Sequence, residues 1–213
     1  MYRFIKRALD ILLSMVGLAA LCPLLLLLML LIRLDSPGSP LFRQQRVGRD
    51  GRLFEIYKLR TMNTNAPRDV ATAELCDADA HITRLGRILR KTSLDELPQL
   101  LNVLFGQMSL IGPRPLVPGE KGIHEARMAL GAYTVRPGIT GWAQVNGRDC
   151  LDPQTKAELD AYYAHHVSFW LDMKIIVFSC ICVLTARGVR EGATEFDEEI
   201  DERKDRAREK SVS

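Results

Sequence analysis

The hydrophobic pattern begins with one long apolar segment near the N-terminus. Residues 11–32 carry no charged side chain, and basic residues flank the segment on both sides. About 20 apolar helical residues cross a hydrocarbon core of about 30 Å, so the segment is predicted to be a membrane helix. A cleaved signal peptide also opens with bases and an apolar stretch, but this run is long for a signal and no clear small-residue cleavage site follows it.

A proline interrupts the predicted membrane helix near its middle. Pro23 removes the backbone hydrogen bond to the Ala19 carbonyl and predicts a kink. Because bases flank both ends, the positive-inside tendency favours a cytoplasmic position for each end. A helix that enters the membrane, bends at Pro23 and returns satisfies that tendency. Kinked helices that span the membrane fully are also common, so the residues alone leave both arrangements open.

The pattern changes after the apolar run to a short alternation of apolar and basic residues from Pro40 to Met62. The pair Asp50-Gly51 divides this stretch and is typical of a tight turn between two strands. A β-hairpin is therefore predicted here. Residues 63–79 are small and polar, and an irregular loop is predicted for them.

Two helices are predicted next, over residues 82–91 and from about Asp95 onward. Pro98 favours a position in the first turn of the second helix, where proline is tolerated, and Asp95 is then the expected N-cap. The leucines of this helix recur at helical spacing and are expected to form core. They are Leu97, Leu100, Leu101 and Leu104.

The C-terminal part predicts two further helices and a polar tail. Asp152 is expected to cap a long helix that Pro153 opens. Residues 169–184 are strongly apolar but include Asp172, so a buried or interface-lying helix is expected rather than a second span. The charged tail after residue 192 has no core-forming stripe and is expected to be solvated or disordered.

These elements together predict a mainly α-helical fold with a small β-hairpin. Three regions follow from them: a membrane helix over residues 1–36, a body over residues 37–192 and the charged tail over residues 193–213. With 213 residues, of which 47% are hydrophobic, the chain has ample material for one core but not for two independent domains.

Charge and cysteine content narrow the chemistry. The tail from residue 195 to 210 holds eight acids and five bases, which leaves 24 bases and 18 acids in the rest of the chain. A basic body suits a partner with phosphates or anionic headgroups, although many solvated surfaces are equally basic. The five cysteines form no CxxC pair, so neither a zinc site nor a disulfide framework is indicated. His165 and His166 are adjacent, which argues against a shared metal.

Four short stretches combine glycine or proline turns with cationic side chains. They are YKLRTM (57–62), RKTSLDELPQLLNVL (90–104), SLIGPRP (109–115) and VRPGITGWAQVNGR (135–148). Glycines let backbone amides approach an anion and arginine matches phosphate oxygens, so these stretches are candidate diphosphate-binding loops. Each taken alone is also an ordinary surface turn.

Two adjacent acids stand at the start of the second predicted helix. Ser93 and Glu96 fit a capping box, and acids in a first helical turn commonly do no more than that. A nucleophilic aspartate needs the same surroundings, however: a helix end and cations that favour its ionised form, and room for Mg²⁺. Asp95 is therefore a candidate nucleophile as well as a candidate cap.

These stretches, in this order, closely resemble the small monotopic phosphoglycosyl transferases, the initiating bacterial sugar transferases. The resemblance covers nearly everything from Tyr2 to about Glu191, and DAYYAHHVSFWLDMKII (160–176) adds to it. It implies transfer of a sugar 1-phosphate from a UDP-sugar to polyprenyl (undecaprenyl) phosphate, with release of UMP. It also implies a bacterial inner-membrane enzyme, active at the cytoplasmic face in the first membrane step of glycoconjugate assembly.

The resemblance also implies roles for individual residues. Asp95 matches the nucleophile that forms a covalent phosphosugar intermediate, Glu96 completes the catalytic pair, and Mg²⁺ is expected beside Asp95. Arg90 and Arg114 match arginines near phosphates. Charge and motif position add three further substrate-binding candidates: Lys58, Arg60 and Arg136.

The resemblance favours the re-entrant arrangement of the N-terminal helix, a helix-break-helix with both ends in the cytoplasm. The sequence departs from the family at one point. Cys22 precedes Pro23, where the family pattern has a serine that could hydrogen-bond to the broken backbone. This departure bears on the detail of the break rather than on its existence.

Two other classes of function each fit part of the sequence less well. A non-enzymatic membrane adaptor that binds anionic lipid would fit the basic loops and the apolar helix, but it leaves the Asp95-Glu96 pair unexplained. Nucleic-acid binding lacks a recognisable motif or an aromatic-basic platform in a chain with 7% aromatic residues, so no nucleic-acid partner is expected.

Overall fold

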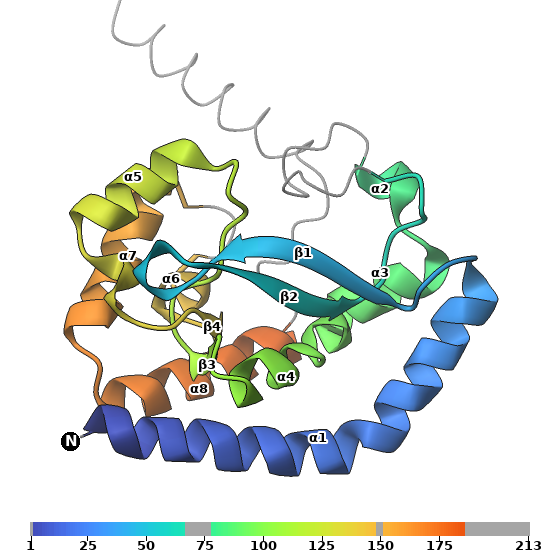
Figure 1. The fold of residues 1–213 in the computed structure, drawn as a ribbon, viewed down its shortest axis with the longest axis horizontal. Coiled ribbons are helices and arrows are strands. Elements are labelled where there is room, and N and C mark those ends of the chain that lie inside the picture. Colours follow the sequence, from blue (N-terminus) through green and yellow to red (C-terminus); the bar gives the residue numbers. More distant parts are fainter. Residues whose placement is uncertain (1, 67–77, 148–150, 186–213) are drawn as a thin grey trace, which may run out of the picture.

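The computed structural model describes residues 2–66, 78–147 and 151–185, and the side chains of residues 78–79 and 183–185 are not among the parts described. Helices dominate these residues and a small antiparallel hairpin accompanies them, which confirms the predicted class (Figure 1). The predicted tail and most of the predicted loop over residues 63–79 lie outside the described residues.

The N-terminal apolar segment forms a single helix, α1 (Tyr2–Asp35), with Pro23 inside it. Figure 1 shows α1 lying along one side of the molecule and then bending toward its C-terminal end. Within the described residues, α1 is the one helix long and apolar enough to cross a membrane. The structure therefore has a bend within a continuous helix, and not two helices separated by a break.

Both parts of α1 are fastened to the rest of the molecule. Near its start, Arg7 donates hydrogen bonds to the carbonyls of Val103 (2.7 Å) and Leu104 (3.1 Å). The buried Asp10 carboxylate accepts a hydrogen bond from the backbone N–H of Leu110 at 3.1 Å. Near its end, Leu28 and Ile32 pack with two other core residues, Leu59 and Leu89. Contacts at both ends fix how α1 bends across the body.

The hairpin follows α1 as predicted. Strands β1 (Leu41–Val47) and β2 (Leu53–Leu59) pair in antiparallel register, with Leu41 opposite Leu59 and Val47 opposite Leu53. The turn includes a short 3₁₀ segment, η1 (Arg49–Gly51), in which Asp50 has φ 56° and Gly51 has φ 74°. Positive φ at both positions is what an Asp-Gly turn supplies at low cost.

The predicted helical region after the hairpin is more broken than the sequence indicates. It contains α2 (Ala78–His81), α3 (Arg84–Thr92), the 3₁₀ turn η3 (Leu94–Glu96) and α4 (Gln99–Leu104). Asp95 is therefore not the N-cap of a long helix, because Ser93 takes φ 57°, ends α3 and starts the separate turn η3. The alternative capping box is also absent, since the Ser93 side chain makes no capping hydrogen bond.

The apolar stripe of α4 is not the core face that was predicted. The most buried residues of this helix are Gln99, Asn102 and Val103. Its leucines are only partly buried, and a Cβ atom at Gly17 of α1 would lie 3.3 Å from Leu100 Cδ1. Leu100 thus lies near α1 and also lines a groove, whereas the polar side chains of Gln99 and Asn102 occupy the interior.

A second, two-stranded parallel pairing lies next to α4. Strand β3 (Ser109–Ile111) pairs with β4 (Gly138–Thr140), with Ser109 opposite Gly138 and Ile111 opposite Thr140. Between these strands come α5 (Lys121–Ala129) and η4 (Ala132–Thr134), and α6 (Trp142–Val145) follows β4.

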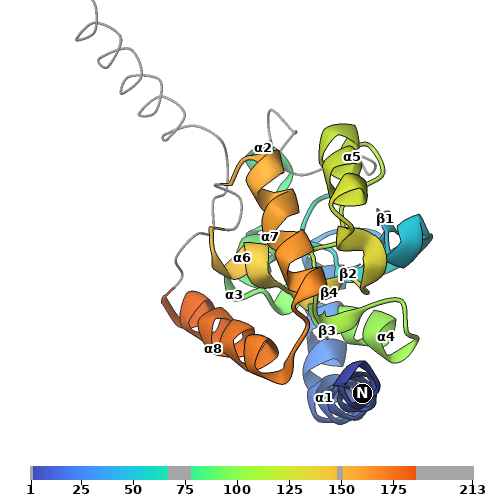
Figure 2. The ribbon, with the colours of Figure 1, turned by 90° about the vertical axis from the view of Figure 1, so that its left-hand side faces the viewer.

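The last two described helices match the predicted C-terminal pattern. Asp152 caps α7 (Pro153–His165) by accepting hydrogen bonds from two backbone N–H groups. Helix α8 (Phe169–Thr185) carries Asp172 in its first turn, fully inside the structure, where it accepts from Tyr163 Oη at 2.8 Å and from Lys6 Nζ at 2.9 Å. Figure 2 shows α1 and α8 on the same side of the molecule with β3 between them.

Candidate active site

Four separate segments bring acidic and basic side chains together at one place. Strand β2 supplies Lys58, turn η3 supplies Asp95 and Glu96, and the loop after β3 supplies Arg114. Lys58 Nζ lies 2.7 Å from Glu96 Oε1, and Arg114 Nη1 lies 3.3 Å from the same oxygen. Arg90, at the end of α3, is close enough to act electrostatically on Asp95. Three of the five predicted substrate-binding cations are thus gathered around the predicted catalytic pair.

A buried asparagine sets the distance between β2 and the acids. Asn102 Oδ1 accepts from the backbone N–H of Tyr57 at 3.0 Å, and Asn102 Nδ2 donates to the Glu55 carbonyl at 2.6 Å. These bonds hold α4 against β2 and so keep Lys58 beside Glu96. The sequence interpretation missed Asn102, although an amide within a leucine-rich helix is a recognisable signal, because buried amides need partners.

The glycines of SLIGPRP and RPGITG serve backbone packing. A Cβ atom at Gly112 would lie 2.3 Å from the Arg136 carbonyl oxygen, and one at Gly138 would lie 2.1 Å from the Gly112 nitrogen. Their amides are also engaged, with Gly112 donating to Thr140 O and Gly138 donating to Pro113 O, both at 2.9 Å. These two amides therefore donate within the chain, where they hold the loop that carries Arg114.

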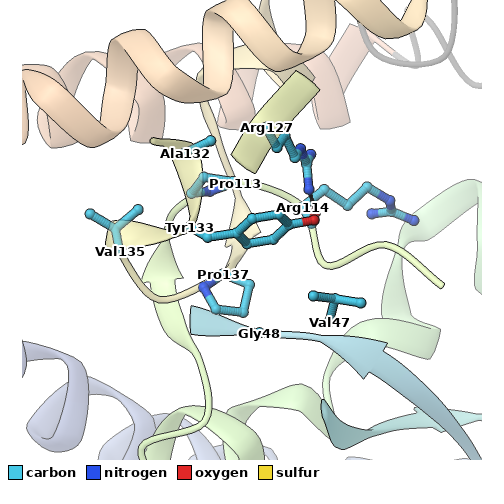
Figure 3. Close-up of a pocket in the computed structure, with 9 residues that line it drawn as sticks. All are labelled: Val47, Gly48, Pro113, Arg114, Arg127, Ala132, Tyr133, Val135 and Pro137. Carbon is cyan, nitrogen blue, oxygen red and sulfur yellow. Dashed lines mark hydrogen bonds between the residues drawn. The ribbon is translucent and has the colours of Figure 1, made fainter. Parts of the chain in front are cut away.

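A buried ion pair supports the same loop from the other side. Arg127 on α5 contacts Asp160 on α7, and its Nη1 donates to the Arg114 carbonyl at 2.9 Å. Figure 3 shows Arg127 and Tyr133 at the cavity behind this loop, with the Arg114 side chain extending away from Tyr133. That cavity measures about 10 Å³, room for one water at most, so this side of Arg114 is support rather than a substrate pocket.

The two acids respond to their surroundings in opposite directions. Burial would raise the pKa of Glu96, but Lys58 and Arg114 outweigh burial and lower that pKa to about 2. Burial raises the pKa of Asp95, and the neighbouring Glu96 adds to that rise, while Lys58, Arg90 and Arg114 oppose it. Glu96 is therefore an anion that holds two cations. Asp95 is the acid of the pair that is protonated more readily.

Replacing Glu96 with glutamine is expected to lower stability at neutral pH. Because the pKa of Glu96 falls from 4.5 to about 2 on folding, its stabilisation is complete above the unfolded value and is lost as pH falls through the folded one. The shift corresponds to roughly 3 kcal/mol. Thermal unfolding in detergent should therefore show Glu96→Gln destabilised at neutral pH and less sensitive to acid than the wild type.

The matched control for this substitution is Glu158→Gln, an exposed acid on α7. It should behave like the wild type at every pH. Identical acid sensitivity in Glu96→Gln and the wild type would contradict the assignment of a stabilising ion pair.

Asp95 is the candidate metal ligand of the site. Within the described part of the chain its carboxylate accepts no hydrogen bond, although its side chain is largely buried. No three His, Cys, Asp or Glu side chains of the described residues cluster closely enough to hold a metal by themselves. Mg²⁺ commonly takes one or two carboxylates together with substrate phosphates and waters. A single aspartate fits such a shared site.

Two predicted substrate-binding arginines lie elsewhere. Arg60 is buried and donates to the carbonyls of Ser36 and Pro37, so it fastens the end of α1 instead of facing the acids. Arg136 donates through Nε to the Gly106 carbonyl at 2.8 Å, and Arg7 is among its charged neighbours. Motif position did not reveal that both guanidinium groups bind backbone carbonyls.

The N-terminal 186 residues match one family. The family model described as "Bacterial sugar transferase" matches residues 1–186. The chain is 42% identical, over 194 residues, to a UDP-N-acetylgalactosamine-undecaprenyl-phosphate N-acetylgalactosaminephosphotransferase of Aeromonas hydrophila, a match that covers 89% of this chain and 46% of that protein. The chain thus spans about half the length of that relative.

Two further relatives are covered more fully. An uncharacterized sugar transferase, EpsL, of Bacillus subtilis is 38% identical, with 88% of this chain and 91% of that protein covered. A UDP-glucose:undecaprenyl-phosphate glucose-1-phosphate transferase of Caulobacter vibrioides is 44% identical, with 84% of this chain and 70% of that protein covered.

Proposed function

This chain belongs to the bacterial sugar transferase family, and on that premise we propose that it transfers a sugar 1-phosphate from a UDP-sugar to undecaprenyl phosphate, releasing UMP. The observation that carries the proposal is the pair Asp95 and Glu96 surrounded by Lys58, Arg90 and Arg114. The names of the relatives from Aeromonas and Caulobacter describe the same kind of reaction.

The reaction divides into two displacements at one phosphorus atom. An Asp95 carboxylate oxygen forms a bond to the sugar-bearing phosphorus, and the bond from that phosphorus to the bridging oxygen breaks, so UMP leaves with the electron pair. A phosphate oxygen of undecaprenyl phosphate then attacks the same phosphorus. The Asp95–phosphorus bond breaks, the carboxylate is restored, and the product is a polyprenyl diphosphate sugar.

The cations around Asp95 and Glu96 can reduce the repulsion between the attacking carboxylate and the substrate diphosphate. A carboxylate approaching a diphosphate brings like charges together, at about 4 kcal/mol per charge pair for 4 Å and an effective dielectric of about 20. Lys58 and Arg114, oriented by Glu96, can offset that repulsion. Arg90 lies near enough to Asp95 to offset it further. Mg²⁺ held by Asp95 and the substrate diphosphate would neutralise further charge.

The structure of α1 supports activity at the cytoplasmic face of the bacterial inner membrane. Both ends of α1 are fastened to the body that carries Asp95, through Arg7 near the start and Arg60 near the end. A helix that crossed the membrane straight would carry its first turns away from that body. We therefore assign α1 a re-entrant course, with both ends on the same side as the catalytic residues, where a sugar nucleotide arrives from water and the acceptor stays in the bilayer.

Replacing Pro23 with alanine is expected to shift some molecules to a spanning topology. The substitution restores a backbone hydrogen bond and removes the ring clash, which favours a straight helix by about 3 kcal/mol. Orientation in the membrane depends on comparable energies. A cysteine introduced as Arg3→Cys in a cysteine-free background, treated in intact cells with an impermeant thiol reagent, should be protected when Pro23 is present and partly labelled when it is replaced.

The control for the labelling is Arg52→Cys in the same background, because Arg52 is exposed beside the hairpin turn and reports the side of the body. It should be protected in intact cells and labelled after the cells are opened. Efficient labelling at position 3 in intact cells with Pro23 in place would disprove the re-entrant course.

The reaction is tested by incubating the purified, detergent-solubilised protein with undecaprenyl phosphate and a panel of UDP-sugars. UMP release with one or more of them, together with a lipid-linked sugar diphosphate, is the expected result. Release of no UMP from any UDP-sugar would overturn the proposal and favour the adaptor that binds anionic lipid. The active UDP-sugar would also indicate which glycoconjugate the chain initiates, whether O-antigen, capsule, exopolysaccharide or a protein-linked glycan.

A further inference from the structure

A groove of about 360 Å³ opens directly beside the catalytic pair. Its walls come from η3, α4, β3, β4 and α8, and most of its lining is aliphatic. The aliphatic residues are Leu97, Leu100, Leu110, Ile111, Ile139 and Ile176. Polar side chains enter the lining at only a few points, among them Glu96. A volume of this size falls in the range of small-molecule sites, about 300–1,000 Å³.

The lining determines what kind of ligand would be stable in the groove. A nucleotide or a sugar would leave its hydrogen-bonding groups unpaired against leucine and isoleucine, which is costly. A hydrocarbon chain would gain roughly 25 cal/mol for each Å² of apolar surface removed from water. The groove thus suits the isoprenoid part of a lipid, and not the UDP-sugar.

The charged side chains at one end of the groove indicate how a ligand would be oriented in it. Glu96 lines the groove, and its carboxylate holds Lys58 and Arg114, so a ligand with an apolar body and an anionic head would meet cations at this end. The phosphate of such a ligand would then lie next to Asp95, one residue away in the same turn.

The groove also lies where a membrane lipid could enter. Ile176 forms part of one wall from α8, and Ile181 on the same helix is 47% exposed, so α8 carries apolar surface beyond the groove lining. Leu100, which also lines the groove, lies close to Gly17 of the membrane helix α1. Figure 2 shows these two helices on the same side of the molecule, with β3 between them.

We propose that this groove binds the first isoprenoid units of the polyprenyl phosphate acceptor, with the acceptor phosphate held at the Lys58 and Arg114 end. The assignment rests on the proposed transferase function and adds the acceptor site to it. It also explains why Leu97 and Leu100 are only partly buried, because both line the groove that the lipid chain would occupy.

The test compares two neighbouring tryptophan substitutions on α8. Ile176→Trp places a larger ring into the groove from a position that is 38% exposed, and Val177→Trp adds the same ring at a more exposed position outside the lining. Ile176→Trp should raise the KM for undecaprenyl phosphate by about tenfold, the loss of roughly two buried methylene groups of acceptor contact. The burst of UMP formed without acceptor should match the wild type in both variants.

Labelling of the wild-type protein keeps the test independent of folding in the variants. A prenyl phosphate that carries a diazirine on its first isoprene units should, after irradiation, modify the peptides containing Leu97, Ile139 or Ile176. Modification confined to other peptides, or an unchanged acceptor KM in Ile176→Trp, would overturn the groove assignment. Failure of the wild type to form UMP from any UDP-sugar would instead overturn the transferase function on which this proposal rests. Labelling needs no turnover, so it tests the groove assignment independently of that function.

Discussion

Replacing Asp95 with asparagine is expected to reduce sugar phosphate transfer by roughly a thousandfold or more. Asparagine has nearly the shape of aspartate but lacks the nucleophilic oxygen, so no covalent phosphosugar can form. The side chain is largely buried in the turn η3 and accepts no hydrogen bond within the described residues, so the substitution should leave the fold intact. UMP release from the active UDP-sugar measures the loss.

A direct observation of the intermediate separates this role from a purely electrostatic one. Wild-type protein quenched after exposure to the UDP-sugar alone should carry a sugar phosphate on the peptide containing Asp95, detected by mass spectrometry, and Asp95→Asn should carry none. Asp152→Asn makes the same chemical change at an exposed helix cap and should keep full activity. Near-normal turnover by Asp95→Asn would refute the nucleophile assignment.

Features that depend on neighbouring residues were predictable from the sequence. The Asp50-Gly51 turn and its alternating flanks predicted the hairpin, because the left-handed backbone at both turn positions is a local preference of those residues. Asp152 before Pro153 predicted the start of α7, because an aspartate cap and a proline in the first helical turn are also local preferences. The bend of α1 is likewise consistent with the proline inside that helix.

Features that depend on distant residues were not predictable in the same way. Asn102 and Arg127 support the site through hydrogen bonds to residues 45 and 13 positions away, Tyr57 and Arg114, and no local pattern specifies such partners. Asp95 was expected to cap a helix because Pro98 follows it. The left-handed conformation of Ser93 ends α3 early, and the chain forms a separate 3₁₀ turn instead.

The glycine-rich stretches show how one residue type can have two physical meanings. Glycine permits close approach of backbone to a phosphate and equally to another backbone. At Gly112 and Gly138 the close approach is between two backbone segments. The arginines next to these two glycines have different partners. Arg114 reaches Glu96, whereas Arg136 binds a carbonyl. Sequence position could therefore select the candidate cations but could not show which of them meet.

Removal of divalent metal is expected to stop turnover completely. The charges at the site come to two acids, Asp95 and Glu96, against three nearby bases, of which Lys58 and Arg114 are already paired with Glu96. A diphosphate brings further negative charge, and each unscreened pair at about 4 Å costs about 4 kcal/mol at an effective dielectric of about 20. Excess EDTA should abolish UMP release, and added Mg²⁺ should restore it.

The same experiment distinguishes a catalytic metal from a structural one. Asp95 alone is a weak binding site without the substrate phosphates, and no cluster of three metal-binding side chains exists within the described residues. The thermal unfolding midpoint of the substrate-free protein should therefore be the same with and without EDTA. A lowered midpoint would indicate that the metal supports the fold. Full activity in excess EDTA would contradict the metal requirement, because Lys58, Arg90 and Arg114 would then neutralise the diphosphate without a metal ion.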